Sequence, residues 1–140
     1  MAKIIGGGNL PNIPWQEKPA DCWLPIWRYS ENPVIGRNPF KGMGRIYNSA
    51  VIPWNGKFKG VFRSEDTSAR PFLYIGDSED GIHWEFQKEK IHMHDPDGTP
   101  HDPFYAYDPR CVKVEDTYYI LWCGDFDGAS IGIASTKDFK

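Results

Sequence analysis

Apolar residues along most of this chain come in short alternating segments separated by glycine, proline, asparagine and aspartate, and helical periodicity is almost absent. Residues 46–54 and 57–63 are two such segments, and the Asn55-Gly56 pair lies between them. Asn-Gly is the preferred pair for the two-residue turn of a β-hairpin, because both residues tolerate positive φ. The pattern therefore predicts two antiparallel strands joined by a tight turn.

Two further strands are predicted at residues 71–76 and 82–86, on either side of the turn residues Ser78-Glu79-Asp80-Gly81. Residues 87–105 are rich in Asp-Pro, Asp-Gly and Pro-His pairs, which favour a long loop. The loop leads to Tyr105-Ala106-Tyr107-Asp108-Pro109-Arg110 and then to the apolar run 111–122. Pro109 favours an extended Asp108 and donates no hydrogen bond, so we expect the Asp108 carboxylate at the mouth of a strand, facing a cavity.

The second half of the chain repeats the first. Residues 50–58 align with residues 110–118 at an offset of 60, turn against turn, and residues 76–80 align with residues 134–138 at an offset of 58. A four-stranded unit that recurs at this spacing is typical of the blades of a β-propeller. The innermost strands of a propeller begin at the central channel, so the equivalent residues Asn48 and Asp108 should converge on one axial pocket. A β-sandwich is the alternative, because two matched units are few.

Residues 1–45 differ from the repeats in their high proline content, which argues against helix and against central strands. We expect an extended leader over residues 1–45 that wraps a surface and is held there by Trp15, Trp23 and Trp27. Residues 46–140 then form the first two blades of an incomplete propeller domain.

Two blades cannot close a ring, because propellers have about four to eight. The pattern also stops at Asp138-Phe139-Lys140, before an outer strand of the second blade. We therefore expect the amino-terminal part of a larger protein, or a piece that needs a partner or a second copy of itself to cover its edge.

Composition narrows the classes of function. The chain has 140 residues, of which 40% are hydrophobic and 15% aromatic, so it can bury a core. Its net charge of -3 and pI near 5.8 offer no basic surface for nucleic acid or an anionic membrane. It shows no signal peptide and no apolar run of the roughly 20 residues that a membrane span needs, so the expected location is cytoplasmic.

The cysteines and histidines give no metal signature. Cys22, Cys111 and Cys123 lack metal-type spacing, and we interpret them as reduced and structural. His83 is expected to pack within a turn-to-strand element. His92-Met93-His94 with Asp95 offers ligands for adventitious binding, but we predict no required metal and no cofactor.

Several motifs, in order and at compatible spacing from about residue 27 onward, resemble the opening of glycoside hydrolase family 130, the β-mannoside phosphorylases and related β-mannosidases. The motifs are Asn32-Pro33-Val34-Ile35, Tyr47-Asn48-Ser49-Ala50-Val51, Gly60-Val61-Phe62-Arg63, Ser78-Glu79-Asp80-Gly81-Ile82-His83-Trp84, Tyr107-Asp108-Pro109-Arg110 and Ile131-Gly132-Ile133-Ala134. The resemblance implies a five-bladed propeller with a sugar site on its axis. It also implies three further blades.

The resemblance assigns roles to particular residues. Asp108 matches the general acid, which protonates the departing glycosidic oxygen through a sugar hydroxyl. Asn48, Ser49 and Arg63 match positions that hold the mannosyl unit, and Arg70 falls near the phosphate-binding arginine. The residues alone leave other interpretations open: Asp108 as a turn cap, Asn48 and Ser49 as a strand end, and Arg63 as a solvated hairpin end.

The implied activity is inverting phosphorolysis of a β-mannoside by inorganic phosphate, giving α-mannose 1-phosphate and a shortened acceptor. A single carboxylic acid is sufficient for this reaction, because phosphate is already anionic, whereas an inverting hydrolase needs a second carboxylate to activate water. One alternative is hydrolysis of a β-mannoside by a β-mannosidase of the same family. The second alternative is that the chain is a sugar-binding or inactive fragment.

Overall fold

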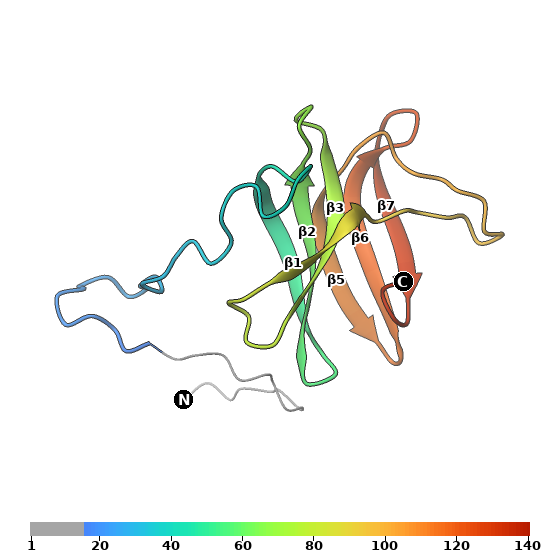
Figure 1. Ribbon diagram of the computed structural model, residues 1–140. Coiled ribbons are helices and arrows are strands. Elements are labelled where there is room, and N and C mark those ends of the chain that lie inside the picture. Colours follow the sequence, from blue (N-terminus) through green and yellow to red (C-terminus); the bar gives the residue numbers. More distant parts are fainter. Residues whose placement is uncertain (1–15) are drawn as a thin grey trace.

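The computed structural model describes residues 16–140, which form seven strands in two antiparallel sheets and no helix (Figure 1). The first sheet has the order β1 (Ile46–Trp54), β2 (Lys57–Glu65), β3 (Pro71–Ser78) and β4 (Glu85–Lys90). The second has the order β5 (Ala106–Val114), β6 (Thr117–Asp125) and β7 (Ala129–Thr136). The all-β class is confirmed, and no helix of the described residues is long and apolar enough to cross a membrane.

The predicted hairpin is confirmed. Trp54 pairs with Lys57, and both turn residues have positive φ, 48° for Asn55 and 78° for Gly56. In the second sheet Val114 pairs with Thr117 around an equivalent turn, where Glu115 has a φ of 56°. A left-handed conformation in the turn matches the right-handed twist of the strands on both sides.

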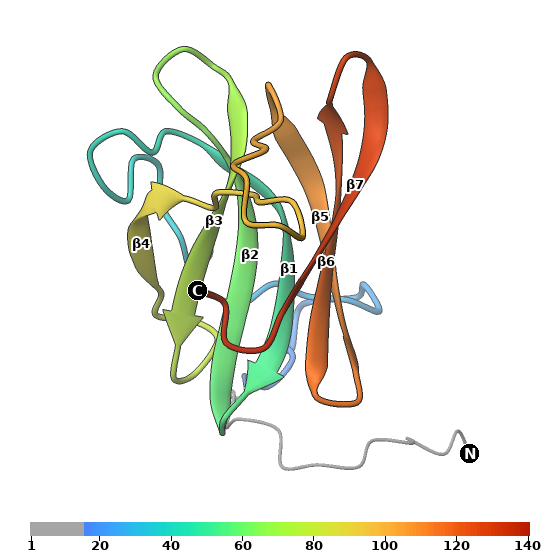
Figure 2. The ribbon, with the colours of Figure 1, turned by 90° about the vertical axis from the view of Figure 1, so that its right-hand side faces the viewer.

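The repeat is also confirmed. Strands β5 and β6 begin and end 60 residues after β1 and β2, and β7 begins and ends 58 residues after β3. The first strands of the two units, β1 and β5, run side by side in the same direction, with their tight turns at the same end (Figure 2). This is the arrangement expected of neighbouring propeller blades.

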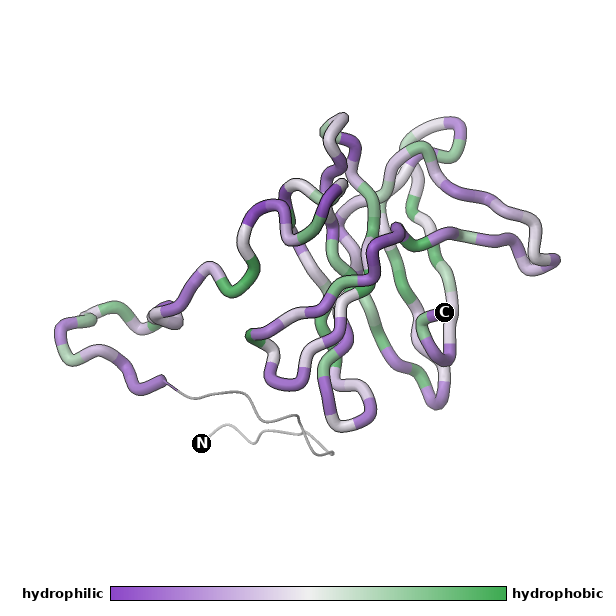
Figure 3. Tube along the Cα trace, in the orientation of Figure 1, coloured by the Kyte–Doolittle hydropathy of each residue, from purple (hydrophilic) through white to green (hydrophobic). Residues whose placement is uncertain are grey.

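The core fills the space between the two sheets. The first sheet contributes Val61, Leu73 and Ile75, and the second contributes Tyr118, Ile120 and Trp122. The segment after β7 turns back, so that the Phe139 ring centre lies 5.1 Å from Trp54 and 5.0 Å from Tyr118. In Figure 3 the apolar residues lie mainly along the strands and the polar residues mainly in the loops.

A large aromatic ring lies directly against a glycine in each unit. A Cβ atom added at Gly132 would come within 2.3 Å of the Trp122 ring, and one added at Gly60 within 2.2 Å of the Phe62 ring. Phe62 and Trp122 are equivalent in the repeat. Glycine is therefore required at these strand positions, because the ring occupies the space that a Cβ atom would need.

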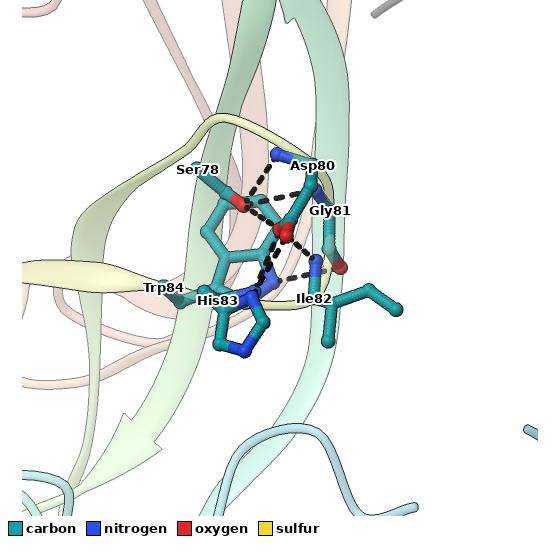
Figure 4. Close-up of polar contacts among 6 residues, drawn as sticks. All are labelled: Ser78, Asp80, Gly81, Ile82, His83 and Trp84. Atoms are coloured by element: carbon teal, nitrogen blue, oxygen red, sulfur yellow. Dashed lines mark hydrogen bonds and ion pairs between the residues drawn. The ribbon is translucent and has the colours of Figure 1, made fainter. Parts of the chain in front are cut away.

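The turn between β3 and β4 corrects two predictions. The Asp80 carboxylate accepts hydrogen bonds from the backbone N–H groups of Ile82 and His83, both 2.8 Å, and contacts the His83 ring at 2.7 Å (Figure 4). These N–H groups are not available to a ladder, so β4 begins at Glu85 rather than at residue 82. The prediction that His83 packs was wrong, because its side chain is exposed.

The leader was only partly predicted. Residues 16–45 contain no strand beyond an isolated bridge between Phe40 and Met43, and their first part projects away from the sheets (Figure 1). Trp23 is almost fully exposed and does not hold the segment, and Trp15 lies outside the described residues. Phe40 contacts the first sheet, with its ring centre 6.0 Å from Tyr74.

The outward face of the second sheet is apolar and exposed. Ile131 is 68% exposed, whereas its equivalent in the first sheet, Leu73, is 1% exposed because it packs on the second sheet. Val112, Val114 and Ile133 are likewise exposed, and they repeat the positions of Ile52, Trp54 and Ile75, which pack at the interface between the sheets. The second sheet thus carries the same apolar pattern as the packed face of the first, without a partner in residues 16–140.

We expect the isolated 140-residue chain to self-associate through this face, because contiguous exposed apolar surface and an open strand edge promote association. Ile131→Lys should raise the concentration at which the chain stays monomeric several-fold, as measured by size-exclusion chromatography with light scattering. Gln87→Lys, which adds the same charge to an exposed position of β4 in the first sheet, is the control. A monodisperse, cooperatively melting wild-type monomer would contradict the expectation.

A second prediction concerns Asp80. Hydrogen bonds from the backbone and ring of His83, and from the backbone of Ile82, hold the pKa of Asp80 well below its ordinary value. A carboxylate with a lowered folded-state pKa stabilises the fold above its unfolded pKa of about 3.9 and loses this effect as the pH falls further. Asp80→Ala should lower the Tm of the protein by a few degrees at neutral pH, and the difference should shrink below a pH of about 4.

Glu79→Ala is the matched control for Asp80→Ala. Glu79 contacts Lys57 at the surface, and an exposed ion pair contributes little to stability. An equal loss of Tm in both variants, or a difference that does not change with pH, would show that the Asp80 hydrogen bonds do not stabilise the turn.

Candidate functional site

Asp108 lies in an irregularity at the start of β5. Tyr107 pairs with Cys123 and Arg110 pairs with Leu121, so Asp108 and Pro109 lie opposite one residue of β6. Asp108 has a φ of 52°, which corrects the expectation of an extended conformation. Such a bulge changes the direction of a side chain, and Pro109, which is fully buried, has no N–H group to leave unpaired there.

The Asp108 carboxylate pairs with Arg63 of β2. The distance from Arg63 Nη1 to Asp108 Oδ1 is 2.9 Å, and the side chains are 24% and 34% exposed. The pair therefore joins the first sheet to the second at the end where β5 begins. It brings together two of the predicted site residues that lie 45 positions apart.

Two tyrosine rings lie against the Arg63 guanidinium. Its central carbon is 4.7 Å from the centre of the Tyr47 ring and 5.3 Å from that of Tyr107. The Arg63 Nε atom is buried and has no hydrogen-bond partner. The remaining donors of the guanidinium suit paired hydroxyl groups of a ligand, and the neighbouring carboxyl group can exchange a proton.

Asn48 and Ser49 lie at the start of β1, where the pairing with β2 is also irregular between Ile46 and Ser49. Both are exposed, and the Ser49 hydroxyl donates to the Tyr47 carbonyl oxygen at 3.3 Å. Because β1 and β5 run side by side in the same direction, these residues lie at the same end of the sheets as Asp108. They make no direct hydrogen bond to Arg63 or Asp108 in the described structure.

Arg70 lies in the loop between β2 and β3, at this end of the sheets. The loop is ordered by Asp66, whose Oδ1 accepts hydrogen bonds from the Ser68 N–H, the Ser68 hydroxyl and the Arg70 N–H. The Ser68 hydroxyl is the main cause of the lowered pKa of Asp66. The Arg70 guanidinium lies 4.2 Å from the centre of the Phe104 ring and forms no ion pair within residues 16–140.

A hollow in the described residues lies beside Phe104, and its lining does not include Arg63 or Asp108. Its volume is about 790 Å³, and its lining residues are His101, Asp102, Phe104, Asp125, Phe126, Asp127 and Gly128. The nearby histidines bind carboxylates of their own loop: His92 contacts Asp102 at 2.8 Å, and His101 contacts Asp95 at 2.9 Å. Residues 16–140 contain no group of three or more side chains placed to hold a metal ion.

Tyr47, Tyr107 and Phe104 are the contacts that sequence reasoning missed. The repeat contained a signal for two of them, because Tyr47 and Tyr107 are 60 positions apart and directly precede Asn48 and Asp108. Phe104 gave no signal, since its contact with Arg70 depends on the path of a long loop.

The fold is shared with enzymes that act on glycosides. The structure matches a β-1,2-mannobiose phosphorylase from Listeria innocua with a TM-score of 0.67 and 17% identity, over 84% of this chain and 49% of that chain. It matches a putative glycoside hydrolase from Parabacteroides distasonis with a TM-score of 0.64 and 24% identity, over 81% of this chain and 39% of that chain. These similarities define the fold class.

The sequence defines the family. The sequence profile described as β-1,4-mannooligosaccharide phosphorylase, of glycoside hydrolase family 130, matches residues 9–140. The chain is also 43% identical to the β-1,4-mannooligosaccharide phosphorylase of Ruminococcus albus, over 99% of this chain and 43% of that protein. The chain therefore belongs to glycoside hydrolase family 130, and it spans less than half the length of this relative.

Proposed function

We propose that the full-length protein cleaves β-mannosides with inorganic phosphate and releases α-mannose 1-phosphate. The observation that carries the proposal is the Arg63–Asp108 pair, which places a carboxyl group and a guanidinium together where the two repeated units begin. The similarity to the Ruminococcus albus enzyme supports β-1,4-linked manno-oligosaccharides as the substrate class.

The proposed reaction forms one bond and breaks one. An oxygen of phosphate attacks C1 of the mannosyl unit, and the glycosidic bond from C1 to the departing oxygen breaks with inversion. Asp108 supplies the proton for the departing oxygen, through a hydroxyl of the bound sugar. Arg63, Asn48 and Ser49 hold the mannosyl hydroxyls, because amide, hydroxyl and guanidinium groups offer donors in fixed geometry.

Arg70 is proposed to bind phosphate. A guanidinium matches two phosphate oxygens at once, and no carboxylate of residues 16–140 forms an ion pair with Arg70 that would compete. Phe104 supports it from one side by a cation–π contact. This residue favours phosphorolysis over hydrolysis, because attacking water does not need such a cation.

The two sheets supply only part of a site, since the Arg63 and Asp108 side chains are still 24% and 34% exposed at the end of the sheets. We propose that residues 1–45 form a leader and that residues 46–140 form the first two blades of a five-bladed propeller. The exposed apolar face of the second sheet supports this, because it repeats the face through which the first sheet packs. Further blades or a second subunit then supply the remaining walls.

The proposal is tested by incubating the full-length protein with β-1,4-mannobiose and varied phosphate. We expect α-mannose 1-phosphate to form in proportion to substrate loss, and almost no cleavage without phosphate. Equal turnover without phosphate would show that the protein is a β-mannosidase. Asp108→Asn keeps the size of the side chain but cannot donate the acidic proton, so turnover should fall by ~10²–10⁴, with little change in substrate binding.

Arg70→Ala should weaken the binding of phosphate and leave the binding of the mannoside unchanged. Loss of a charge-assisted hydrogen bond costs about 1.5–3 kcal/mol, which corresponds to a rise of roughly 10- to 150-fold in the apparent phosphate constant. The KM for the mannoside should stay within about twofold of wild type, a shift below ~0.5 kcal/mol. Arg28→Ala removes an equal charge from the leader and should leave both constants unchanged. A rise in the mannoside constant equal to that in the phosphate constant would reject the role of Arg70.

A further inference from the structure

Arg63 is enclosed by matching residues of the two repeats. Tyr47 is the second residue of the first strand of one unit, and Tyr107 occupies the equivalent position of the other. The guanidinium carbon lies 4.7 Å from one ring centre and 5.3 Å from the other. The position of Arg63 therefore depends on how closely the two sheets approach each other.

Tyr47 is itself fixed by a hydrogen bond. Its hydroxyl donates to Glu65 Oε2 at 3.0 Å, and Glu65 follows Arg63 by two positions on the same face of β2. Glu65 is thus a carboxylate close enough in the strand to compete with Asp108 for Arg63. Glu65 is held by Tyr47 and lies 4.0 Å from Arg45, so it does not bind Arg63. Arg63 therefore binds Asp108.

The hydrogen bonds of Arg63 do not by themselves explain its position. Its Nη1 atom binds Asp108, but its Nε atom is buried without a partner, which is unfavourable. A buried donor persists in this state only when the surrounding structure holds it there, and such groups are frequent at binding sites. Cation–π contact with Tyr47 and Tyr107 provides that support.

We propose that Tyr47 and Tyr107 are positioning residues that clamp the Arg63 guanidinium between them, which orients it both for Asp108 and for the hydroxyls of the bound mannosyl unit. The inference rests on the proposed function for the identity of the sugar. The two ring contacts leave the N–H groups of the guanidinium as its means of binding a carboxylate or a hydroxyl.

The test compares Tyr47→Leu with Tyr47→Phe in the full-length protein. Tyr47→Leu removes the ring and should lower kcat/KM for β-1,4-mannobiose by about 5- to 30-fold, the equivalent of one partly desolvated cation–π contact. Tyr47→Phe keeps the ring and loses the bond to Glu65, which Arg45 still contacts, so it should retain most of the activity. The apparent phosphate constant should not change in either variant.

A double-mutant cycle with Arg63→Met separates positioning from a general structural role. In the Arg63→Met background, Tyr47→Leu should cause no further loss, because the ring acts through the guanidinium. The same loss in both backgrounds, or no loss in the single variant, would overturn the proposal. If Tyr47→Leu does not fold, Tyr107→Leu and Tyr107→Phe repeat the test on the second ring.

Calorimetric titration with β-1,4-mannobiose keeps this inference distinct from the proposed reaction. Wild-type protein that binds the disaccharide but does not cleave it with phosphate would reject the phosphorylase assignment alone. The clamp then still predicts that Tyr47→Leu binds β-1,4-mannobiose more weakly than the wild type. In the Arg63→Met background, Tyr47→Leu should not weaken binding further. Binding that is unchanged in Tyr47→Leu would reject the clamp.

Discussion

The packing of the first sheet against the second is the constraint on which the candidate site depends. Full burial of a side chain such as Leu73, Ile75 or Ile120 stabilises a fold by about 1.5–3 kcal/mol, and several such residues meet between the sheets. A partly exposed ion pair such as Arg63–Asp108 contributes about 0–1 kcal/mol. The apolar interface therefore holds the two sheets together, and the ion pair is a consequence of their approach.

The local backbone at Asp108 shows how the chain brings a carboxylate to this interface. A positive φ is uncommon for a residue other than glycine and is maintained only where the surroundings require it. Here the bulge in β5 and the buried Pro109 ring fix the conformation. The same end of β1 is irregular where Tyr47 and Asn48 lie opposite Arg63. Both units thus place their polar residues where regular pairing fails.

Much of the fold could be predicted from local chemistry and from the repeat. Asn55-Gly56 specifies a turn without reference to the rest of the chain, and the offset of 60 follows from aligned turns and strands. The start of β4 could not be predicted, because residues 82–84 alternate like a strand, and only the structure shows that the Asp80 carboxylate binds the N–H groups of Ile82 and His83. Trp23 was misjudged because a large apolar residue need not find a surface to cover.

The candidate site could be predicted only in part. The repeat made Asn48 and Asp108 equivalent, and the family resemblance selected Arg63, but neither indicated that Arg63 and Asp108 bind each other. That contact depends on the separation of two sheets, which no local pattern encodes. The same holds for the ring of Phe104 over Arg70, which is set by the long loop that precedes β5.

The most direct test of this account is a crystal structure of the full-length protein with β-1,4-mannobiose bound. The account predicts that hydroxyl oxygens of one mannosyl unit lie about 3 Å from the Arg63 guanidinium, with the Asp108 carboxyl group within hydrogen-bond reach of the same sugar. A disaccharide bound away from both residues, with their ion pair unchanged, would contradict the claim that the junction of the two units is the sugar site.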